Sequence, residues 1–514
     1  MARRPNVLWL MSDQHNANCV GFAEHPNIQT PNMDRIADEG VVFTRAFCNN
    51  PICSPSRICF MTGQYCHTHR MFGNDHSEIP EANPNTLACQ FRRYGYQTAV
   101  IGKAHMVRRW DEDGFERIRY TDLCDATHLD PTETHYFKYL EDLGLSDFYE
   151  EGSARPGQEY TMDGSAPAKL PYRHSIEHYT GNESLAFLKE RDDERPFFLH
   201  MSFQRPHAPI APAAEHFDMY NPDEMVLPDS AVDYFERRFA GKPEFMQERL
   251  ADGCGYPLAD PNPDRLKRCL ASYYALISAI DSEIGRVLDY LDEVGELENT
   301  VVLYCADHGD FAGDHGLFHK NFGIYDSIHR IPFVLRYPGG PSGATCDAIV
   351  ESVDWYPTLC RLCDIPVPDG RDGRDLVPVV NGKADGKEAA FCEWDWGNPG
   401  GKVSAIRTRD FRLVFYGSLD EGELYDHRND PGEIANVWAD PEYADVRFDL
   451  LAQLMRFTLQ YRTDTGRSSH ERGLNKRFAP TNLVHKGRRY WRDLKEAYTK
   501  ETVWPPKGEK SIRR

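Results

Sequence analysis

Asn6-Val7-Leu8-Trp9-Leu10-Met11-Ser12-Asp13 places five apolar residues in succession and ends at a carboxylate. An unbroken apolar run of this length is typical of a strand that is buried on both faces, as the strands of a parallel sheet are. We therefore predict a buried parallel strand over Asn6–Ser12, with Asp13 at its carboxyl end.

The sequence beyond this strand alternates further strands with helices. The clearest helix is Arg265–Val294, whose apolar residues recur with a period of 3.6. The other helices that we expect are Pro31–Glu39, Leu87–Tyr94 and Asp354–Cys363. The other expected strands are Gln97–Ile101, Phe197–Phe203, Asn299–Cys305 and Ile331–Arg336. This alternation favours an α/β fold, with a large and mostly parallel sheet sandwiched by helices.

The character of the sequence changes after about Gly382, where short apolar segments are separated by Gly, Asp and Asn. Such segments predict a smaller C-terminal antiparallel sheet, closed by a helix near Ala444–Tyr461. The strands that we expect there are Ala389–Trp394, Val403–Arg407, Arg412–Tyr416 and Glu423–Tyr425. We therefore divide the chain into a main domain over residues 1–385, a C-terminal α+β subdomain over 386–463 and a basic extension over 464–514.

Composition and charge restrict the class of protein. The 514 residues are 40% hydrophobic and 27% charged, which excludes a collagen, a coiled coil and wholesale disorder. The net charge of −21 argues against nucleic acid or an anionic membrane as the partner. Because no apolar run reaches the length of a membrane span or a signal-peptide core, we expect neither. The 14 cysteines are scattered, as in a reduced cytoplasmic protein.

The charge balance reverses at the end of the chain. Arg462–Arg514 holds 15 Lys and Arg against 6 Asp and Glu, and it has few apolar anchors. A nucleic-acid arm would share this composition, but the acidic remainder of the chain favours contact with a neighbouring subunit. We therefore expect a homo-oligomer formed through this extension, with a loose tail as the alternative.

Polar side chains follow four of the predicted strands at their carboxyl ends, where open α/β sheets bind ligands. These side chains are Asp13, Gln14, Lys103, His105, Arg205, His207, Asp307 and His308. Asp13, Gln14, Asp307 and His308 offer oxygen and imidazole ligands that suit a divalent cation. Lys103, His105, His207 and Lys320 would surround a tetrahedral oxyanion. The alternative for Asp307–Asp310 is a polar turn that caps the next helix.

A second pattern is Pro51-Ile52-Cys53-Ser54-Pro55-Ser56-Arg57. A cysteine at the start of a helix holds a thiol of lowered pKa, because the helix N-terminus favours an anion. This pattern suggests a cysteine nucleophile, with Arg57 clamping an oxyanion. The alternative is a buried cysteine beside an N-cap serine.

Cys53-Ser54-Pro55-Ser56-Arg57 resembles the Cys-x-Pro-x-Arg signature of the formylglycine-dependent (type I) sulfatases, members of the alkaline phosphatase superfamily. The resemblance extends in family order over most of residues 5 to about 440. It includes Pro5–Gln14, Thr30–Asp34, Gly102–His105, Pro206–Pro209, Ala306–Gly309, Lys320, Gly422–Asp426 and Asn429–Glu433. The fold that this implies is alkaline-phosphatase-like.

The resemblance assigns a role to each residue. It implies that a separate maturation enzyme oxidises Cys53 to formylglycine, whose hydrate attacks the sulfur of a small sulfated substrate and later expels sulfate. The metal would be bound by Asp13, Gln14, Asp307, His308 and the group at position 53. Arg57 and Lys103 would support that group, Lys320 would bind the sulfate, His207 would be the general acid, and His105 would be the base that starts the elimination.

Two positions depart from the family pattern. Gln14 stands where many members have a second Asp, and His308 stands where Asn is frequent. An amide lowers the negative charge at the metal and an imidazole softens the ligand set, so magnesium, manganese and zinc are alternatives to the expected calcium. The Asp-His pair also occurs in related phosphonate monoester and phosphodiester hydrolases. Hydrolysis of such esters at the same site is therefore the second candidate function. An inactive sulfate- or glycan-binding homologue is the third.

Overall fold

The computed structural model describes residues 4–74, 85–105, 114–122, 131–149, 166–251, 262–320, 323–395, 402–417, 419 and 421–460. Residues Met1–Tyr461 form one compact unit that contains two sheets. The predicted division at residue 385 therefore stays a prediction, and the basic extension lies outside the described residues. Within the described part of the chain, no helix has both the length and the apolarity needed to cross a membrane.

The large sheet has eight strands in the order β4-β3-β5-β1-β6-β7-β2-β8. The bounds of these strands are β1 Asn6–Asp13, β2 Val41–Phe47, β3 Gln97–Gly102, β4 Arg117–Tyr120, β5 Phe197–Pro206, β6 Thr300–Ala306, β7 Phe333–Arg336 and β8 Ala344–Glu351. Strand β1 lies at the centre and runs parallel to both of its neighbours, β5 and β6. Among the described strands of this sheet, β7 alone runs antiparallel to both of its neighbours, β6 and β2. The expected mostly parallel sheet is confirmed.

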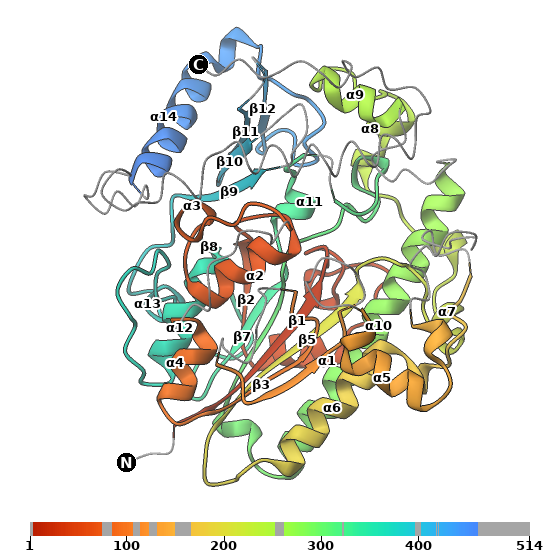
Figure 1. Ribbon diagram of the computed structural model, residues 1–514. Coiled ribbons are helices and arrows are strands. Elements are labelled where there is room, and N and C mark those ends of the chain that lie inside the picture. Colours follow the sequence, from red (N-terminus) through yellow and green to blue (C-terminus); the bar gives the residue numbers. More distant parts are fainter. Residues whose placement is uncertain are drawn as a thin grey trace, which may run out of the picture. The chain divides into compact units, whose positions relative to one another are not determined.

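Successive residues of β1 point to opposite faces of the sheet, because the side chains of a strand alternate. Leu8 and Leu10 pack into one hydrophobic cluster, whereas Val7, Trp9 and Met11 pack into another. The first cluster is covered by α1 (Pro31–Asp38), α6 (Ile176–Glu190) and α10 (Pro263–Glu293), and the second by α2 (Cys53–Thr62), α4 (Leu87–Arg93) and α12 (Trp355–Leu362). Figure 1 shows these two helical layers on opposite sides of the sheet. The central strand is therefore buried on both faces, as its apolar run predicts.

The second sheet is antiparallel, in the order β12-β11-β10-β9. Its strands are β9 Ala389–Asp395, β10 Lys402–Thr408, β11 Phe411–Tyr416 and β12 Gly422–Asp426, and α14 (Ala444–Gln460) packs against it (Figure 1). The shorter helices are α3 Cys66–His69, α5 His135–Asp142, α7 Ala214–Phe217, α8 Val232–Phe235, α9 Glu244–Ala251, α11 Asp326–His329 and α13 Val377–Val380. The expected smaller C-terminal antiparallel sheet is confirmed.

Candidate active site

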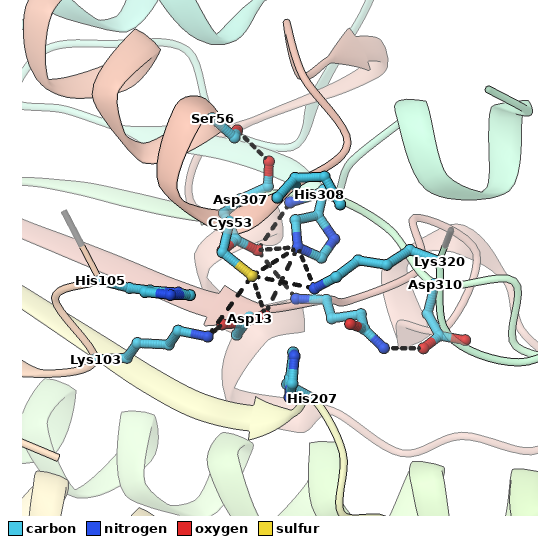
Figure 2. A network of polar contacts seen from close by, with 12 residues as sticks. Asp13, Cys53, Ser56, Lys103, His105, His207, Asp307, His308, Asp310 and Lys320 are labelled. Atoms are coloured by element: carbon cyan, nitrogen blue, oxygen red, sulfur yellow. Dashed lines mark hydrogen bonds and ion pairs between the residues drawn. The ribbon is translucent and has the colours of Figure 1, made fainter. Parts of the chain in front are cut away.

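The carboxyl ends of β1, β3, β5 and β6 converge on the N-terminus of α2. Strand β1 ends at Asp13, β3 leads into Lys103, β5 leads into His207 and β6 leads into Asp307. Figure 2 shows Cys53 at the centre of this group, with Lys103 and His105 on one side, Lys320 on the other and His207 below. Strand ends that are far apart in sequence thus bring the predicted side chains to one place.

Four side chains of this group could hold a metal ion. Their ligand atoms all lie within 4.8 Å of one another, and they belong to Asp13, Cys53, Asp307 and His308. All four residues are buried, with exposed fractions of 0 to 1%. The His308 Nε2 atom is 3.8 Å from an Asp13 oxygen and 3.7 Å from an Asp307 oxygen. Two carboxylates and an imidazole in a buried cluster are the donor set of a divalent cation.

The Cys53 sulfur lies among cationic groups. The Nζ atom of Lys320 is 3.1 Å away, the Nε2 atom of His308 is 3.3 Å away and the Nζ atom of Lys103 is 3.7 Å away. Burial and the Asp13 carboxylate oppose ionisation, but the charges of Lys103, Lys320 and His308 outweigh them and hold the pKa of the thiol well below its ordinary value. The charges around Cys53 therefore favour the thiolate form of its side chain.

The helix start differs in one detail from the sequence interpretation. Helix α2 begins at Cys53 itself, and Ile52 is the capping position, so no serine caps this helix through its side chain. The two serines instead tie α2 to the strand ends. Ser54 donates its hydroxyl hydrogen to the carbonyl of His105 at 2.6 Å, and Ser56 donates to the carbonyl of Asp307 at 2.5 Å.

Arg57 supports the two carboxylates. Its Nε atom donates to Asp307 at 2.8 Å and its Nη2 atom lies 3.4 Å from Asp13. Its Nη1 atom donates to the Lys103 carbonyl at 2.9 Å and to the Ser202 hydroxyl at 2.8 Å. With all three nitrogens engaged and the side chain 2% exposed, the guanidinium organises Asp13 and Asp307. These contacts are compatible with the supporting role that the resemblance implies for Arg57, and the oxyanion clamp suggested from the residues alone stays a prediction.

The remaining cations surround the same point. Lys103 forms an ion pair with Asp13, and the Lys320 Nζ atom is 3.0 Å from the His308 Nε2 atom. Burial opposes ionisation of Asp13, but Lys103, His207, Lys320 and Arg57 together hold its pKa well below the ordinary value. Two ammonium groups thus lie beside a carboxylate and a thiol, which gives a local cluster of positive charge in a chain of negative net charge.

Comparison with known families gives this geometry a context. The family model described as Sulfatase matches residues 5–365, which is more than half of the chain. The chain belongs to the sulfatase family. The C-terminal region of N-sulphoglucosamine sulphohydrolase is a second family model that matches, over residues 313–460. The predicted membership of the type I sulfatases, within the alkaline phosphatase superfamily, is confirmed.

Individual relatives agree with this assignment. The sulfatase is 31% identical to an arylsulfatase of Clostridium perfringens, over 90% of this chain and 95% of that protein. It is 28% identical to an N-acetylglucosamine-6-O-sulfatase of Bacteroides thetaiotaomicron, over 90% of this chain and 87% of that protein. A solved phosphonate monoester hydrolase of Agrobacterium radiobacter superposes with a TM-score of 0.75 at 25% identity, covering 89% and 96% of the two chains. The protein is accordingly a sulfuric ester hydrolase.

Within this sulfatase, Gln14 is held by residues whose roles the sequence did not reveal. Its backbone N–H donates to Asp307 at 3.0 Å, and its side-chain amide nitrogen lies 2.6 Å from an Asp310 oxygen and 3.1 Å from the His319 Nδ1 atom. The backbone of Gln14 is left-handed, with φ of 61°. Since the amide nitrogen is engaged, the carbonyl oxygen is the side-chain atom left to bind a cation. Asp310 belongs to the Asp307–Asp310 motif, which is the sequence feature that could indicate a role for Asp310 in the site.

Proposed function

We propose that this sulfatase hydrolyses sulfate monoesters of carbohydrates, with sulfated glucosamine as the substrate class, through formylglycine at position 53 and one divalent cation. The observation that carries the mechanism is the position of Cys53. It lies at the first residue of α2, within 4.8 Å of three metal-binding side chains and beside two lysines. The amino-sugar substrate is supported by the N-acetylglucosamine-6-O-sulfatase relative and by the N-sulphoglucosamine sulphohydrolase C-terminal match.

The donor set fits a divalent cation. Asp13, Gln14, Asp307 and His308 would hold it, with calcium as the expected ion and magnesium, manganese or zinc as alternatives. Such an ion supplies Lewis-acid activation at the sulfate ester and at the nucleophile. Formylglycine would supply a hydrated aldehyde as the nucleophile that releases sulfate without a second attack at sulfur.

The lysines have the geometry of sulfate-binding groups. The Nζ atoms of Lys103 and Lys320 are 3.7 and 3.1 Å from the side-chain atom of residue 53, so an ester attacked there meets both ammonium groups. Lys103 supports the nucleophile and Lys320 binds the sulfate oxygens. Positive charge that is already in place stabilises negative charge as it develops on those oxygens.

His207 and His105 would move protons. Burial and Lys320 hold the pKa of His207 well below its ordinary value, which makes the free imidazole neutral at neutral pH. Its Nδ1 atom is 2.7 Å from the Ala208 carbonyl oxygen and donates its hydrogen there, so Nε2 is the atom that takes up a proton. An anionic sulfate beside the ring favours the protonated form, and Nε2 then donates to the leaving oxygen. His105 lies on the same side of residue 53 as Lys103, away from Lys320, and would take a proton from residue 53 (Figure 2).

Partners and compartment are part of the same proposal. A maturation enzyme converts Cys53, a homo-oligomer forms through residues 464–514, and the protein works in the cytoplasm. The oligomer is supported by the basic charge of the extension against an acidic remainder. The compartment is supported by buried thiols that form no disulfide, such as Cys48, Cys305 and Cys360.

The test compares the wild type with Cys53→Ala, and uses Cys59→Ala as the matched control because Cys59 is a buried thiol of the same helix. Mass spectrometry of the peptide that contains residue 53 is expected to show formylglycine in the active enzyme. The Cys53→Ala variant is expected to lose at least about a thousandfold in kcat/KM, as removal of a nucleophile does, whereas Cys59→Ala keeps most activity.

The substrates are sulfated glucosamines, a nitrophenyl sulfate and a phenylphosphonate ester. The ester of the highest kcat/KM assigns the substrate class, and preference for the phosphonate would overturn the proposed function in favour of the activity of the Agrobacterium hydrolase. An enzyme that is fully active with an unmodified Cys53 would refute the mechanism.

A further inference from the structure

A tight turn carries Lys103 and His105 into the active site. It begins at Gly102, where φ is 111° and a Cβ atom would lie 1.7 Å from the Ser202 carbonyl oxygen, so only glycine fits. Lys103 then donates its backbone N–H to that carbonyl at 2.7 Å. Two residues later, His105 has a left-handed backbone with φ of 47°. A left-handed residue other than glycine is unfavourable, so surrounding groups must hold this turn in place.

Asp122 supplies the groups that hold it. The residue follows the end of β4 and is 3% exposed. One carboxylate oxygen accepts the backbone N–H of His105 at 2.9 Å, and the other accepts the backbone N–H of Ala104 at 3.2 Å. Hydrogen bonds to a charged carboxylate are stronger than those between neutral groups, and burial keeps water from competing. Asp122 thus binds two consecutive amides of the turn.

Helix α2 holds the other side of the turn. The His105 carbonyl accepts the Ser54 hydroxyl at 2.6 Å, and the Lys103 carbonyl accepts Arg57 at 2.9 Å. The backbone of Lys103–His105 is therefore fixed between the Asp122 carboxylate and the helix that starts at Cys53. A shift of the turn would move Lys103 and His105 relative to residue 53 without changing either side chain.

We propose that Asp122 is a positioning residue for catalysis, which sets the placement of Lys103 and His105 against residue 53. This inference rests on the proposed function, because it takes Lys103 as the cation that supports the group at position 53 and that a bound sulfate ester also meets, and it takes His105 as the base. Asp122 reaches no reacting atom directly in this arrangement, since its two carboxylate oxygens are bound to backbone amides. Its effect on the reaction passes through the turn.

The experiment compares Asp122→Asn with Tyr149→Phe. An Asn side chain presents one acceptor and one donor, so one of the two backbone N–H groups loses its partner. Tyr149 donates its hydroxyl hydrogen to the backbone carbonyl of Asp122 at 2.5 Å, so Tyr149→Phe perturbs the same segment and keeps the carboxylate. Asp122→Glu also keeps the carboxylate. If Asp122→Asn does not fold, Asp122→Glu takes its place in the comparison with Tyr149→Phe.

The expected result for Asp122→Asn is a kcat about 30- to 100-fold lower, which is the size of effect that a misplacement of about 1 Å produces. The pH profile of kcat shifts with it, because His105 changes its surroundings. The affinity for inorganic sulfate, measured by titration calorimetry, falls at least about fivefold because Lys103 moves. Tyr149→Phe keeps kcat, the pH profile and sulfate affinity within about twofold of the wild type. Asp122→Glu recovers more of kcat than Asp122→Asn does.

Two outcomes overturn the inference. The first is an Asp122→Asn variant that lowers Tm but keeps the wild-type kcat, pH profile and sulfate affinity, since that is a structural role alone. The second is an equal loss in Tyr149→Phe, since the carboxylate is then not responsible. Failure of the proposed function is seen separately, because it is a property of the wild type: the wild type would prefer the phosphonate ester or would be fully active with an unmodified Cys53. The sulfate titration still tests Asp122 in that case.

Discussion

Gln14 shows at the scale of a single residue how a neutral side chain is fitted to the proposed metal site. Its amide nitrogen is bound by Asp310, which itself accepts the backbone N–H groups of Ala312 at 2.7 Å and His319 at 3.0 Å. These contacts orient the amide, and its oxygen is the atom that would bind the proposed cation. Residues that orient a ligand in this way contribute about 10- to 100-fold to metal affinity.

We therefore predict that Asp310→Ala weakens calcium binding by about 10- to 100-fold, measured by titration calorimetry and by the metal content of the purified protein. The matched control is Asp314→Ala, which removes an acidic residue of the same loop that contacts Ser230 and not Gln14. Equal calcium affinity in Asp310→Ala and the wild type would show that Gln14 is not oriented by Asp310, or is not a ligand.

Residues at strand ends could be predicted from sequence, whereas their supporting partners could not. Asp13, Lys103 and Asp307 each follow an apolar strand, and a parallel sheet brings such ends to one edge. The ion pairs of Arg57 could not be predicted, because its partners Asp13 and Asp307 lie on two other elements that only the tertiary structure brings together. Asp122 carries no sequence signal, since its function lies in two backbone contacts.

At the scale of elements, helix α1 depends on a carboxylate from another helix. Its own capping residue, Thr30, makes no side-chain cap. Asp281 of α10 instead accepts the backbone N–H groups of Asn32 at 3.1 Å and Met33 at 2.8 Å. Burial outweighs these hydrogen bonds and raises the pKa of Asp281 to about 6. This contact joins two of the helices that cover one face of the large sheet.

The raised pKa has a consequence for stability. A carboxyl group that binds its proton more tightly when folded stabilises the fold at low pH, and this contribution is lost as pH rises from about 4 to about 6. A shift of about two pKa units corresponds to about 3 kcal/mol. We predict that the free energy of unfolding of the wild type, measured with urea, loses this contribution between pH 4 and 6.5. The free energy of unfolding of Asp281→Asn should not show that loss.

The control for that prediction is Asp289→Asn, an exposed residue of the same helix that pairs with Arg35. Its unfolding free energy should follow the wild-type pH dependence. Identical pH profiles for Asp281→Asn and the wild type would mean that Asp281 titrates normally in the folded protein.

Elements with a strong pattern were predictable and edge elements were not. Strand β1 and helix α10 lie where their apolar patterns place them. Strand β4 contains two arginines and is only half-buried, and β8 begins with alternating half-buried and exposed residues. Such strands lack a continuous apolar run, because they lie at the two edges of the large sheet. The reversed direction of β7 also could not be predicted, since a short apolar run carries no information on direction.

At the scale of the whole molecule, a buried network of ion pairs joins the two sheets. Arg412 of β11 pairs with both Asp326 of α11 and Glu433, and Arg407 of β10 lies 3.0 Å from Asp326. Asp326, His427 and Glu433 could by composition hold a metal ion, but the two guanidinium groups neutralise these carboxylates. The small sheet is therefore bound to α11, which follows Lys320 in the sequence.

This network predicts that residues 4–460 unfold as one cooperative unit. Replacing Arg412 by Met leaves the buried Glu433 and the half-buried Asp326 with reduced compensation, and breaking a buried pair such as Arg412–Glu433 costs about 3 to 5 kcal/mol. We expect Arg412→Met to lower Tm in a calorimetric scan that still shows a single transition. Arg409→Met is the control, because Arg409 is 56% exposed and pairs with Asp347 at the surface, where an ion pair contributes at most about 1 kcal/mol. Two separate transitions in the wild type would instead divide the protein near residue 385. Two separate transitions in Arg412→Met would mean that the small sheet keeps its structure without the arginine that joins it to α11.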